Sequence, residues 1–485
     1  MPTATKQQYE AVIGLEVHIQ LNTKSKAYSS DATEYGALPN TQVSPVSLGH
    51  PGTLPMFNKK AVEYAVRLGI ACQSTIRERN EFARKNYFYA DLPKGYQITQ
   101  HHTPICNGGR ILIKDANGNE KVIGITRIHM EEDSGKSIHD LDPFNTLIDL
   151  NRAGVPLLEM VSEPDFRDGV EAYNYLSEVR KLVRYLDISD GNMEEGSLRC
   201  DVNVSVRPVG QEKFGTKVEV KNMNSFRNVQ RAIDFEIKRQ IELIESGGEV
   251  TQQTRNFDAA KGTTSAMRTK EDAHDYRYFN EPDLQPVIVT QAYINEVHGT
   301  MPPLPNELLT KYTKELGLSD YDAGVLTENK QFAMYFEELI THTSNVKAAA
   351  NWMMGSVKSY LNDKAIEIGA FPVKPEKIAA CIALVDQGKI SNTVAAQNVF
   401  PLLIEQPDAE PFALATANNW IQESDSDALL DFVRQAIAKY PEKVDEYKNG
   451  KKGLLGLFMG EVMKLSRGKA DPKVASKLVQ EELEK

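Results

Sequence analysis

Apolar and polar residues alternate along several segments of roughly the first 295 residues, which is the pattern of half-buried β-strands. In residues 12–21, one set of alternate positions is apolar: Ile13, Leu15, Val17, Ile19 and Leu21. The positions between them hold Glu16, His18 and Gln20. Because successive side chains of a strand point to opposite faces, one face is predicted to be core and the other to present a carboxylate and an imidazole about 7 Å apart. That pair suits a divalent cation or an oriented water, although a solvent-facing edge strand explains this segment as well when it is taken alone.

Two later segments repeat the alternation with more polar groups. In residues 198–207 the polar positions are Arg199, Asp201, Asn203, Ser205 and Arg207. In residues 216–222 one face holds Lys217, Glu219 and Lys221. Arginine and asparagine beside aspartate are typical of hydrogen-bonded recognition. These faces are therefore interpreted as the floor of a site for phosphate and metal, with a fully solvated sheet face as the alternative.

Further carboxylates lie in residues 126–136 and 157–161. In the first segment, Arg127, His129 and Glu131 alternate with Ile128, Met130 and Glu132. In the second, Glu159 interrupts an apolar run, where a carboxylate is costly unless it is paired or bound to a metal. A salt bridge to Arg152 or Arg127 would satisfy it, and so would a cation. Oxygen ligands with one imidazole suit Mg²⁺ or Mn²⁺ better than a structural zinc.

The remainder of the chain lacks this alternation and is predicted to be helical. Three prolines in residues 302–305 cannot continue a helix, so a domain boundary is expected there, and a softer one at residues 406–411. One helix is also clear in the first part. It is capped by Asn224 or Ser225 and ends at Gly247–Gly248. Its apolar positions recur at every fourth residue: Val229, Ile233, Ile237 and Ile241.

The length of 485 residues exceeds one compact core, so two or three domains are expected. No run of about 18 apolar residues exists, and the N-terminus lacks the apolar region of a signal peptide, so a cytoplasmic location is expected. The four cysteines are scattered without metal-ligand spacing, which argues against a disulfide framework.

The net charge of −11 argues against a protein that coats nucleic acid by charge alone. Residues 439–477, however, hold ten basic and five acidic residues, a balance of +5. This tail is either a solvated helix face or a contact for a phosphate backbone. The chain has no P-loop and no Rossmann fingerprint, so bound ATP would need a sheet face with Arg or Lys and Mg²⁺.

At these residues the chain closely resembles the B subunits of the aspartyl/glutamyl-tRNA amidotransferases. The matching motifs occur in order over nearly the whole chain, at residues 12–18, 84–89, 92–97, 129–133, 161–165, 193–201, 221–226, 275–279, 281–283, 351–355 and 456–463. The resemblance implies an α+β fold. A large cradle domain with a mixed or antiparallel sheet would span residues 1–295, an all-α domain residues 296–408, and a small tail similar to the YqeY family residues 409–485.

The resemblance also implies a reaction and partners. The side-chain carboxylate of Glu or Asp, misacylated on tRNA(Gln) or tRNA(Asn), would attack the γ-phosphate of ATP, and ammonia would then displace phosphate. The ammonia would come from glutamine in an amidase-type glutaminase, the A subunit, within a heterotrimer that also has a small C subunit. The Mg²⁺ ligands would be Glu16, His18, Glu132 and Glu159, with Glu131 a neighbour.

Other roles follow from the same resemblance. Contacts to nucleotide, metal or the reacting carboxylate would come from Arg199, Asp201, Asn203, Glu219 and Lys221. Lys85 and Lys94, with Glu132, would line the ammonia passage and handle the proton of ammonium; two lysines on a surface loop are the alternative. The tail would contact the tRNA elbow through Lys448, Lys451, Lys452, Lys464, Arg467 and Lys469.

The chain departs from the family at a zinc knuckle that many relatives carry. The four cysteine positions read Ser29, Asp31, Ser44 and Ser47, so no zinc is expected. Packing and Pro45, Pro51 and Pro55 are expected to hold this loop instead.

Two other function classes stay open from the sequence. One is a protein that binds tRNA and assembles the complex without chemistry of its own, in which the Glu and His positions would tolerate substitution. The other is a free-standing Mg²⁺-dependent ligase acting on a small amino acid, which the basic tail disfavours.

Overall fold

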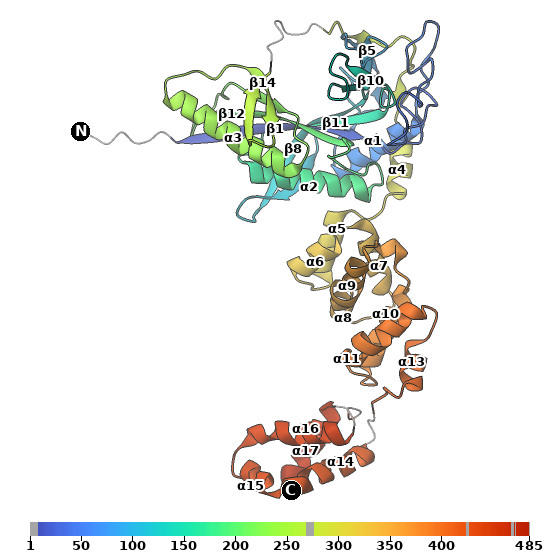
Figure 1. Ribbon diagram of the computed structural model, residues 1–485, viewed down its shortest axis with the longest axis vertical. Helices are drawn as coiled ribbons and strands as arrows, with labels where there is room; N and C mark the ends of the chain where they lie inside the picture. Colours follow the sequence, from blue (N-terminus) through green and yellow to red (C-terminus); the bar gives the residue numbers. More distant parts are fainter. Residues whose placement is uncertain (1–7, 268–275, 423–425, 467–469, 471, 485) are drawn as a thin grey trace, which may run out of the picture. The chain divides into compact units, whose positions relative to one another are not determined.

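The computed structural model describes residues 8–267, 276–422, 426–466, 470 and 472–484 (Figure 1). It divides into two compact units, residues 1–305 and 306–485. The division falls directly after the proline-rich segment at residues 302–305, where a boundary is expected. The finer division at residue 408 stays a prediction, although the last helices enclose a hydrophobic cluster of their own that runs from Leu429 to Leu483.

The first unit is built on a 13-stranded sheet whose centre is β1 (Tyr9–Gln20). Its main path runs β15-β14-β13-β12-β1-β11-β8-β5-β4-β16. The strands are β4 (Ala83–Asn86), β5 (Tyr96–Thr99), β8 (Glu120–Glu132), β11 (Pro156–Ser162), β12 (Leu198–Pro208), β13 (Val218–Lys221), β14 (Gln253–Asp258), β15 (Thr263–Ala266) and β16 (Phe279–Asn280). The pair β13–β14 is parallel and the other pairs of this path are antiparallel, so the predicted mixed sheet is confirmed.

Shorter strands complete this unit. They are β2 (Thr75–Ile76), β3 (Arg79–Asn80), β6 (Cys106–Asn107), β7 (Arg110–Lys114), β9 (Lys136–Ile138), β10 (Leu147–Asp149) and β17 (Val287–Ile288). Two-stranded ribbons are formed by β9 with β10 and by β3 with β17. The β9–β10 ribbon follows the end of β8, the strand that carries the two adjacent glutamates at 131 and 132.

One face of the sheet is apolar and is covered by helices. The predicted core face of β1, from Ile13 to Leu21, is at most 2% exposed. Three helices pack on the sheet: α1 (Lys59–Ala71), α2 (Gly169–Tyr185) and α3 (Phe226–Glu245) (Figure 1). Because the apolar residues of the alternating strands all join this core, their polar residues are left together on the other face.

Helix α3 forms as its sequence predicts at the N-terminus. The hydroxyl of Ser225 accepts a hydrogen bond from the backbone N–H of Asn228 at 3.2 Å, which satisfies a free donor of the first turn. The helix buries Glu236 completely, which its apolar period does not indicate. This carboxylate is paired with Arg239 at 2.8 Å and with Arg255 of β14 at 3.0 Å, so its charge is compensated.

The second unit consists of helices. They are α6 (Asp320–Leu326), α7 (Lys330–Leu339), α8 (Val346–Trp352), α9 (Lys358–Lys364), α10 (Pro375–Asp386), α11 (Asn392–Val394), α12 (Phe400–Glu405), α13 (Pro411–Ala417), α14 (Ser426–Lys439), α15 (Pro441–Lys448), α16 (Leu455–Leu465) and α17 (Pro472–Glu484). Helix α4 (Gln291–Gly299) belongs to the end of the first unit, and α5 (Pro305–Thr310) to the start of the second. In the part of the chain that the structure describes, no helix is long and apolar enough to cross a membrane.

The loop of residues 29–47 is closed by hydrogen bonds to Asp31. The carboxylate of Asp31 accepts from the backbone N–H of Ser44 at 2.9 Å and from the hydroxyl of Ser47. The hydroxyls of Ser29 and Ser47 lie 3.1 Å apart. Burial alone would raise the pKa of Asp31, but these hydrogen bonds outweigh it and lower the pKa. Packing and prolines are therefore not the whole support of the loop, because a charged hydrogen-bond centre joins the four positions.

Replacement of Asp31 by alanine is expected to destabilise this loop by about 1–2 kcal/mol, since two hydrogen-bond donors lose a charged acceptor. Limited proteolysis and chemical unfolding measure the loss. Glu34→Ala, which removes an exposed carboxylate of the same loop, is the matched control and is expected to be neutral. Equal effects of both substitutions, or a loop that opens on zinc chelation, would contradict the assignment.

Candidate functional site

The polar face of the sheet is aligned by strand register. His18 of β1 pairs with Arg199 of β12 on one side and with Glu159 of β11 on the other. Glu159 pairs in turn with His129 of β8. Paired residues point to the same side of a sheet, so these four side chains form one row across four strands. The predicted polar faces at residues 16–20 and 199–203 therefore form one continuous surface.

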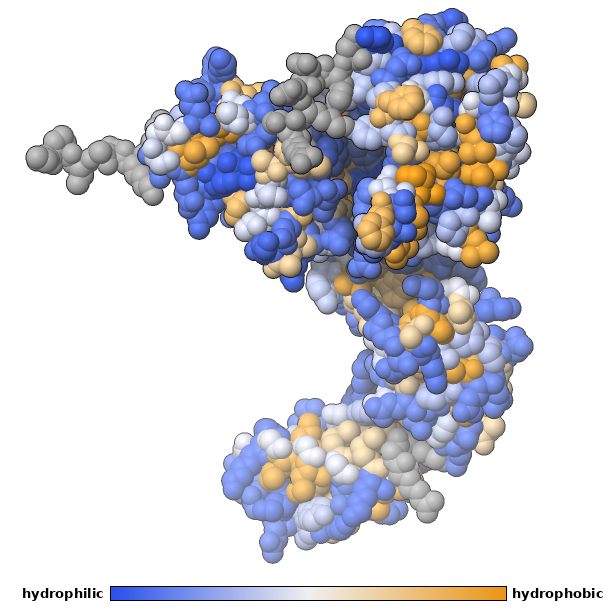
Figure 2. All heavy atoms as spheres, turned by 45° about the horizontal axis from the view of Figure 1, so that its top comes forward, coloured by the Kyte–Doolittle hydropathy of each residue, from blue (hydrophilic) through white to orange (hydrophobic). Residues whose placement is uncertain are grey.

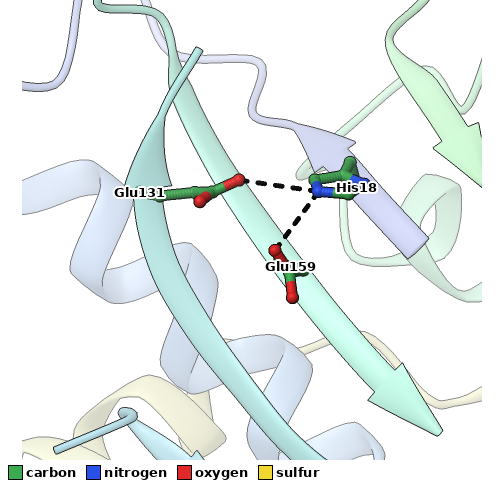
Figure 3. A group of neighbouring side chains, drawn as sticks. All are labelled: His18, Glu131 and Glu159. Atoms are coloured by element: carbon green, nitrogen blue, oxygen red, sulfur yellow. Dashed lines mark ion pairs between the residues drawn. The ribbon is translucent and has the colours of Figure 1, made fainter. Parts of the chain in front are cut away.

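Three of these polar groups converge closely enough to share a metal ion. The structure brings His18, Glu131 and Glu159 together so that one ligand atom from each lies within 4.8 Å of the others (Figure 3). The Nε2 atom of His18 lies 3.2 Å from Oε2 of Glu159 and 3.7 Å from Oε1 of Glu131. Two carboxylates and one imidazole, supplied by three strands, fit an oxygen-preferring divalent cation such as Mg²⁺ or Mn²⁺.

The charges of this cluster are strongly coupled. Burial alone would lower the pKa of His18, but its hydrogen bond to Glu159 and the nearby carboxylates outweigh burial and raise the pKa to about 9. Burial alone would raise the pKa of Glu159, but the hydrogen bond from His18 and the charges of both histidines lower it to about 2. Without a metal ion, a proton on His18 therefore compensates the carboxylates.

Glu16 lies on the same strand face as His18, two residues away. Its carboxylate accepts a hydrogen bond from the side-chain amide of Asn203 at 3.0 Å. Burial raises the pKa of Glu16, and so do the charges of Glu159, Asp201 and Glu219. The position is consistent with the predicted ligand role, but Glu16 stands outside the closest three-residue group.

The structure separates the two adjacent glutamates of β8. The resemblance gives Glu132 as a Mg²⁺ ligand with Glu131 as a neighbour, and in the structure Glu131 lies in the group with His18 and Glu159 while Glu132 lies outside it. The role of each toward a metal stays a prediction. Adjacent residues of a strand face opposite sides, so the side chain of Glu132 leaves the polar face. It pairs with Lys94 and accepts a hydrogen bond from the backbone N–H of Ile98 at 2.9 Å.

A set of cations follows the cluster across β12 and β13. Arg199 lies 2.9 Å from the carboxylate of Asp133, and burial, which alone would lower its pKa, is outweighed by that charge. Lys221 lies 2.5 Å from Asp201 and 3.0 Å from Glu219. Alternating signs on neighbouring strands give a surface that can hold both a metal ion and the oxygens of a phosphate.

The two lysines that were predicted to act together lie in different surroundings. Lys85, on β4, lies over the rings of Tyr276 and Tyr87, 4.8 Å and 5.7 Å from their centroids. Its charge helps to lower the pKa of Glu159, after the larger effects of burial and the histidines. Lys94 pairs with Glu132 on the other side of β8. Lys85 thus belongs to the cluster's surroundings and Lys94 to a separate compartment.

Two residues at the site have no role in the sequence interpretation. His129 lies 3.6 Å from Glu159 and 3.8 Å from Glu131. The alternation of His129 with Glu131 on one strand face is the signal for it. Asp133 forms an ion pair with Arg199. The only signal for this role in the sequence is that a buried arginine needs a counter-ion.

Of the two alternatives for Glu159, the salt bridge with an arginine is absent among the described residues. Its partners are His18 and His129, at 3.2 Å and 3.6 Å. Arg152 instead lies 3.6 Å from Asp133 and donates to the backbone oxygen of Ser134. Strand register explains the difference, because Glu159 stands directly between two histidine-bearing strands.

The described tail lysines are exposed, and two of the four have acidic neighbours. Lys451 lies 3.0 Å from Glu446, and Lys452 lies 4.0 Å from Glu484 and over the ring of Tyr447. Lys448 and Lys464 are exposed at the ends of α15 and α16. Arg467 and Lys469 lie outside the described residues.

The outer surface of the first unit is mixed rather than uniformly polar. Figure 2 shows hydrophobic side chains gathered in patches among hydrophilic ones on the face that it presents. Large apolar residues that are exposed in this unit include Leu38, Met56, Phe88 and Phe144.

Comparison with known proteins places this architecture in a family. The model of the "GatB/GatE catalytic domain" matches residues 11–295, and that of the "GatB domain" matches residues 334–483. A protein of Caldicellulosiruptor bescii, named as the B subunit of an aspartyl/glutamyl-tRNA(Asn/Gln) amidotransferase, is 50% identical over 99% of this chain and 100% of its own length. Proteins with the same name from Alkalilimnicola ehrlichii and Persephonella marina are 50% and 48% identical, each over 98% of this chain and 100% and 99% of their own lengths. The chain therefore belongs to the family of B subunits of the aspartyl/glutamyl-tRNA amidotransferases.

Proposed function

We propose that this chain phosphorylates the side-chain carboxylate of Glu or Asp carried on tRNA(Gln) or tRNA(Asn), with ATP as phosphoryl donor, and amidates it with ammonia. The observation that carries the proposal is the group of His18, Glu131 and Glu159 beside the cations Arg199 and Lys221, on one sheet face of the matched catalytic domain. The relatives' name states the same substrates.

The reaction proceeds in two steps, phosphoryl transfer and amidation. A carboxylate oxygen of the aminoacyl group attacks the γ-phosphorus of ATP, and the bond to ADP breaks. Ammonia then attacks the acyl carbon, phosphate leaves, and the proton lost by nitrogen goes to water. The products are ADP, phosphate and the amidated aminoacyl-tRNA, as expected for a carbon–nitrogen ligase.

The residues of the polar face divide between two tasks in this proposal. His18, Glu131 and Glu159, with Glu16 beside them, would hold Mg²⁺. When bound, Mg²⁺ neutralises phosphate oxygens and lowers the cost of bringing a second anion to them. Arg199 and Lys221 spread the negative charge of the phosphoryl group in transfer.

The remaining polar groups position these residues. Asn203 orients Glu16 by its hydrogen bond, and Asp201 and Glu219 hold the ammonium group of Lys221 from two sides. Thr254 of β14 donates to Glu219 at 2.8 Å and fixes it in turn. Such support keeps charged groups aimed before substrate arrives, which is the form of catalysis that phosphoryl transfer needs most.

Partners and location belong to the same proposal. The relatives are named as subunits, so the chain is proposed to act in a complex with a glutaminase of the amidase type and with a small third protein. Ammonia made by the glutaminase would arrive near Lys94 and Glu132. A cytoplasmic location and the absence of zinc also remain proposals.

A complex in which His18 and Glu159 are replaced by Asn and Gln is expected to lose at least about 100-fold in ATP-dependent amidation. Labelled Glu-tRNA(Gln) and Asp-tRNA(Asn), given with ATP, Mg²⁺ and glutamine, report the amide formed on each. His342→Ala, which removes an exposed imidazole of the second unit, is the control. Full amidation by the double variant would instead favour a tRNA-binding role without chemistry.

The site also has a pH signature in the metal-free chain. The pKa of His18 is raised from 6.5 to about 9, so the stability it contributes is complete below pH 6.5 and is lost as the pH rises through 9. The free energy of unfolding with EDTA is therefore expected to fall by roughly 2–3 kcal/mol from pH 6.5 to pH 9.5. Chemical denaturation measures it, and His18→Gln should remove this fall. An unchanged slope in that variant would sink the assignment.

The tail is expected to bind the phosphate backbone of tRNA. Charge reversal of Lys448 and Lys464 together should weaken tRNA binding about tenfold at low salt and reduce its salt dependence, because two phosphate contacts are lost. Filter binding at several salt concentrations measures both. Lys374→Glu, an exposed lysine before α10, is the control. Equal weakening by the control would show a general charge effect only.

A further inference from the structure

A cavity of about 140 Å³ lies on the side of β8 away from the metal cluster. Its wall includes Glu132 and Lys94, and its other side is formed by the loop that Asp31 closes, through Ser47 and His50. The volume is enough for several molecules of the size of water or ammonia. Glu132 faces this cavity while the adjacent Glu131 joins the metal cluster, so one strand separates the two compartments.

Lys26 also lines the cavity, and its side chain is buried to an unusual degree. The residue is 1% exposed, and its Nζ atom makes one long hydrogen bond, 3.4 Å, to the backbone oxygen of Leu150. Among the described residues, no carboxylate oxygen lies within 4.0 Å of that atom. A buried ammonium without a paired carboxylate is costly, so burial shifts the equilibrium of Lys26 toward the neutral amine.

The groups around Lys26 have opposite effects on its pKa. Burial is the largest effect and lowers its pKa from 10.5 to about 8, and Lys94 lowers it further, against Asp31, Glu132 and Asp149. The other ionisable groups on the cavity wall are Tyr28, His50, Arg84, Tyr96 and Asp283. Both forms of Lys26 are therefore populated near neutral pH.

Lys94 differs from Lys26 in its contacts. Its ammonium group is paired with the carboxylate of Glu132, and it also lies 5.6 Å and 5.5 Å from the ring centroids of Tyr28 and Tyr96. Of the two cavity lysines, Lys26 is thus the one without a carboxylate partner at ion-pair distance.

We infer that Lys26 is the proton acceptor of this cavity and converts ammonium into neutral ammonia before it reaches the acyl phosphate. The inference rests on the proposed function, which supplies the ammonia and the acyl phosphate, and adds a residue to it. An N–H bond of ammonium breaks, and its proton is taken by the lone pair of the Lys26 amine. Neutral ammonia leaves the cavity, and Lys26 returns the proton to a water molecule, which restores the amine.

The test uses the assembled complex with Lys26 replaced by methionine, which keeps the apolar length, or by arginine, which keeps the charge but does not lose its proton. The measurement is the amide formed per glutamine hydrolysed, between pH 7 and pH 9. In both variants the amide formed per glutamine hydrolysed, called the coupling, is expected to be at least about tenfold lower at pH 7.5. In the natural protein this coupling is expected to rise through pH 8, and the rise should be missing from both variants. Lys24→Met, an exposed lysine two residues earlier, is the matched control.

Two further readouts separate the possible outcomes. Hydroxylamine traps the acyl phosphate directly, so hydroxamate formed with ATP should be unchanged in both variants. Thermal unfolding shows whether each variant folds. If Lys26→Met does not fold, the inference is judged from Lys26→Arg alone. Natural-level coupling in Lys26→Met, or restored coupling in Lys26→Arg, overturns the inference. Absence of hydroxamate and amide in the unaltered complex would overturn the proposed function itself.

Discussion

The site depends on the pairing of β1 between β11 and β12. That register places His18 level with Glu159 and Arg199, and Glu16 level with Asp201, so donors from distant parts of the chain meet on one face. A slip of one residue would turn every one of these side chains into the core and bring the apolar set outward. The apolar face of β1 therefore fixes the chemistry as firmly as the polar residues do, because its burial under α1, α2 and α3 sets the register.

Much of this arrangement could be predicted from the alternation of residue types. The strand faces at residues 12–21 and 198–207 and the cap of α3 at Ser225 all follow from local rules, and the structure has them. Partners across the sheet could not be predicted, because register depends on pairing between segments that are not neighbours in the chain. For that reason the sequence left both an arginine and a cation open as partners of Glu159, and it gave no role to His129 and Asp133. Two adjacent glutamates do not reveal which of them faces the polar side, so the sequence placed both Glu131 and Glu132 at or beside the metal.

The two adjacent glutamates give β8 two functions at one point. Glu131 contributes a negative charge to the cluster that attracts a cation, while Glu132 holds Lys94 on the other side of the strand. Their carboxylates repel if both are ionised and unpaired, and each has its own cation: a protonated His18 or a metal ion on one side, a lysine on the other. A single peptide unit of β8 therefore joins the candidate metal cluster to the wall of the cavity.

The loop closed by Asp31 bears on how the protein responds to oxidants. Zinc held by thiolates is released when the sulfurs are oxidised, because the ligands are consumed. In this chain, Ser29, Asp31, Ser44 and Ser47 of the loop carry hydroxyls and one carboxylate, which peroxide does not attack. The cysteines of the chain are all buried, and burial raises the pKa of each thiol, to about 12 for Cys72 and Cys381, so the reactive thiolate is scarce. The hydrogen bonds that close this part of the cavity wall therefore offer no sulfur to an oxidant.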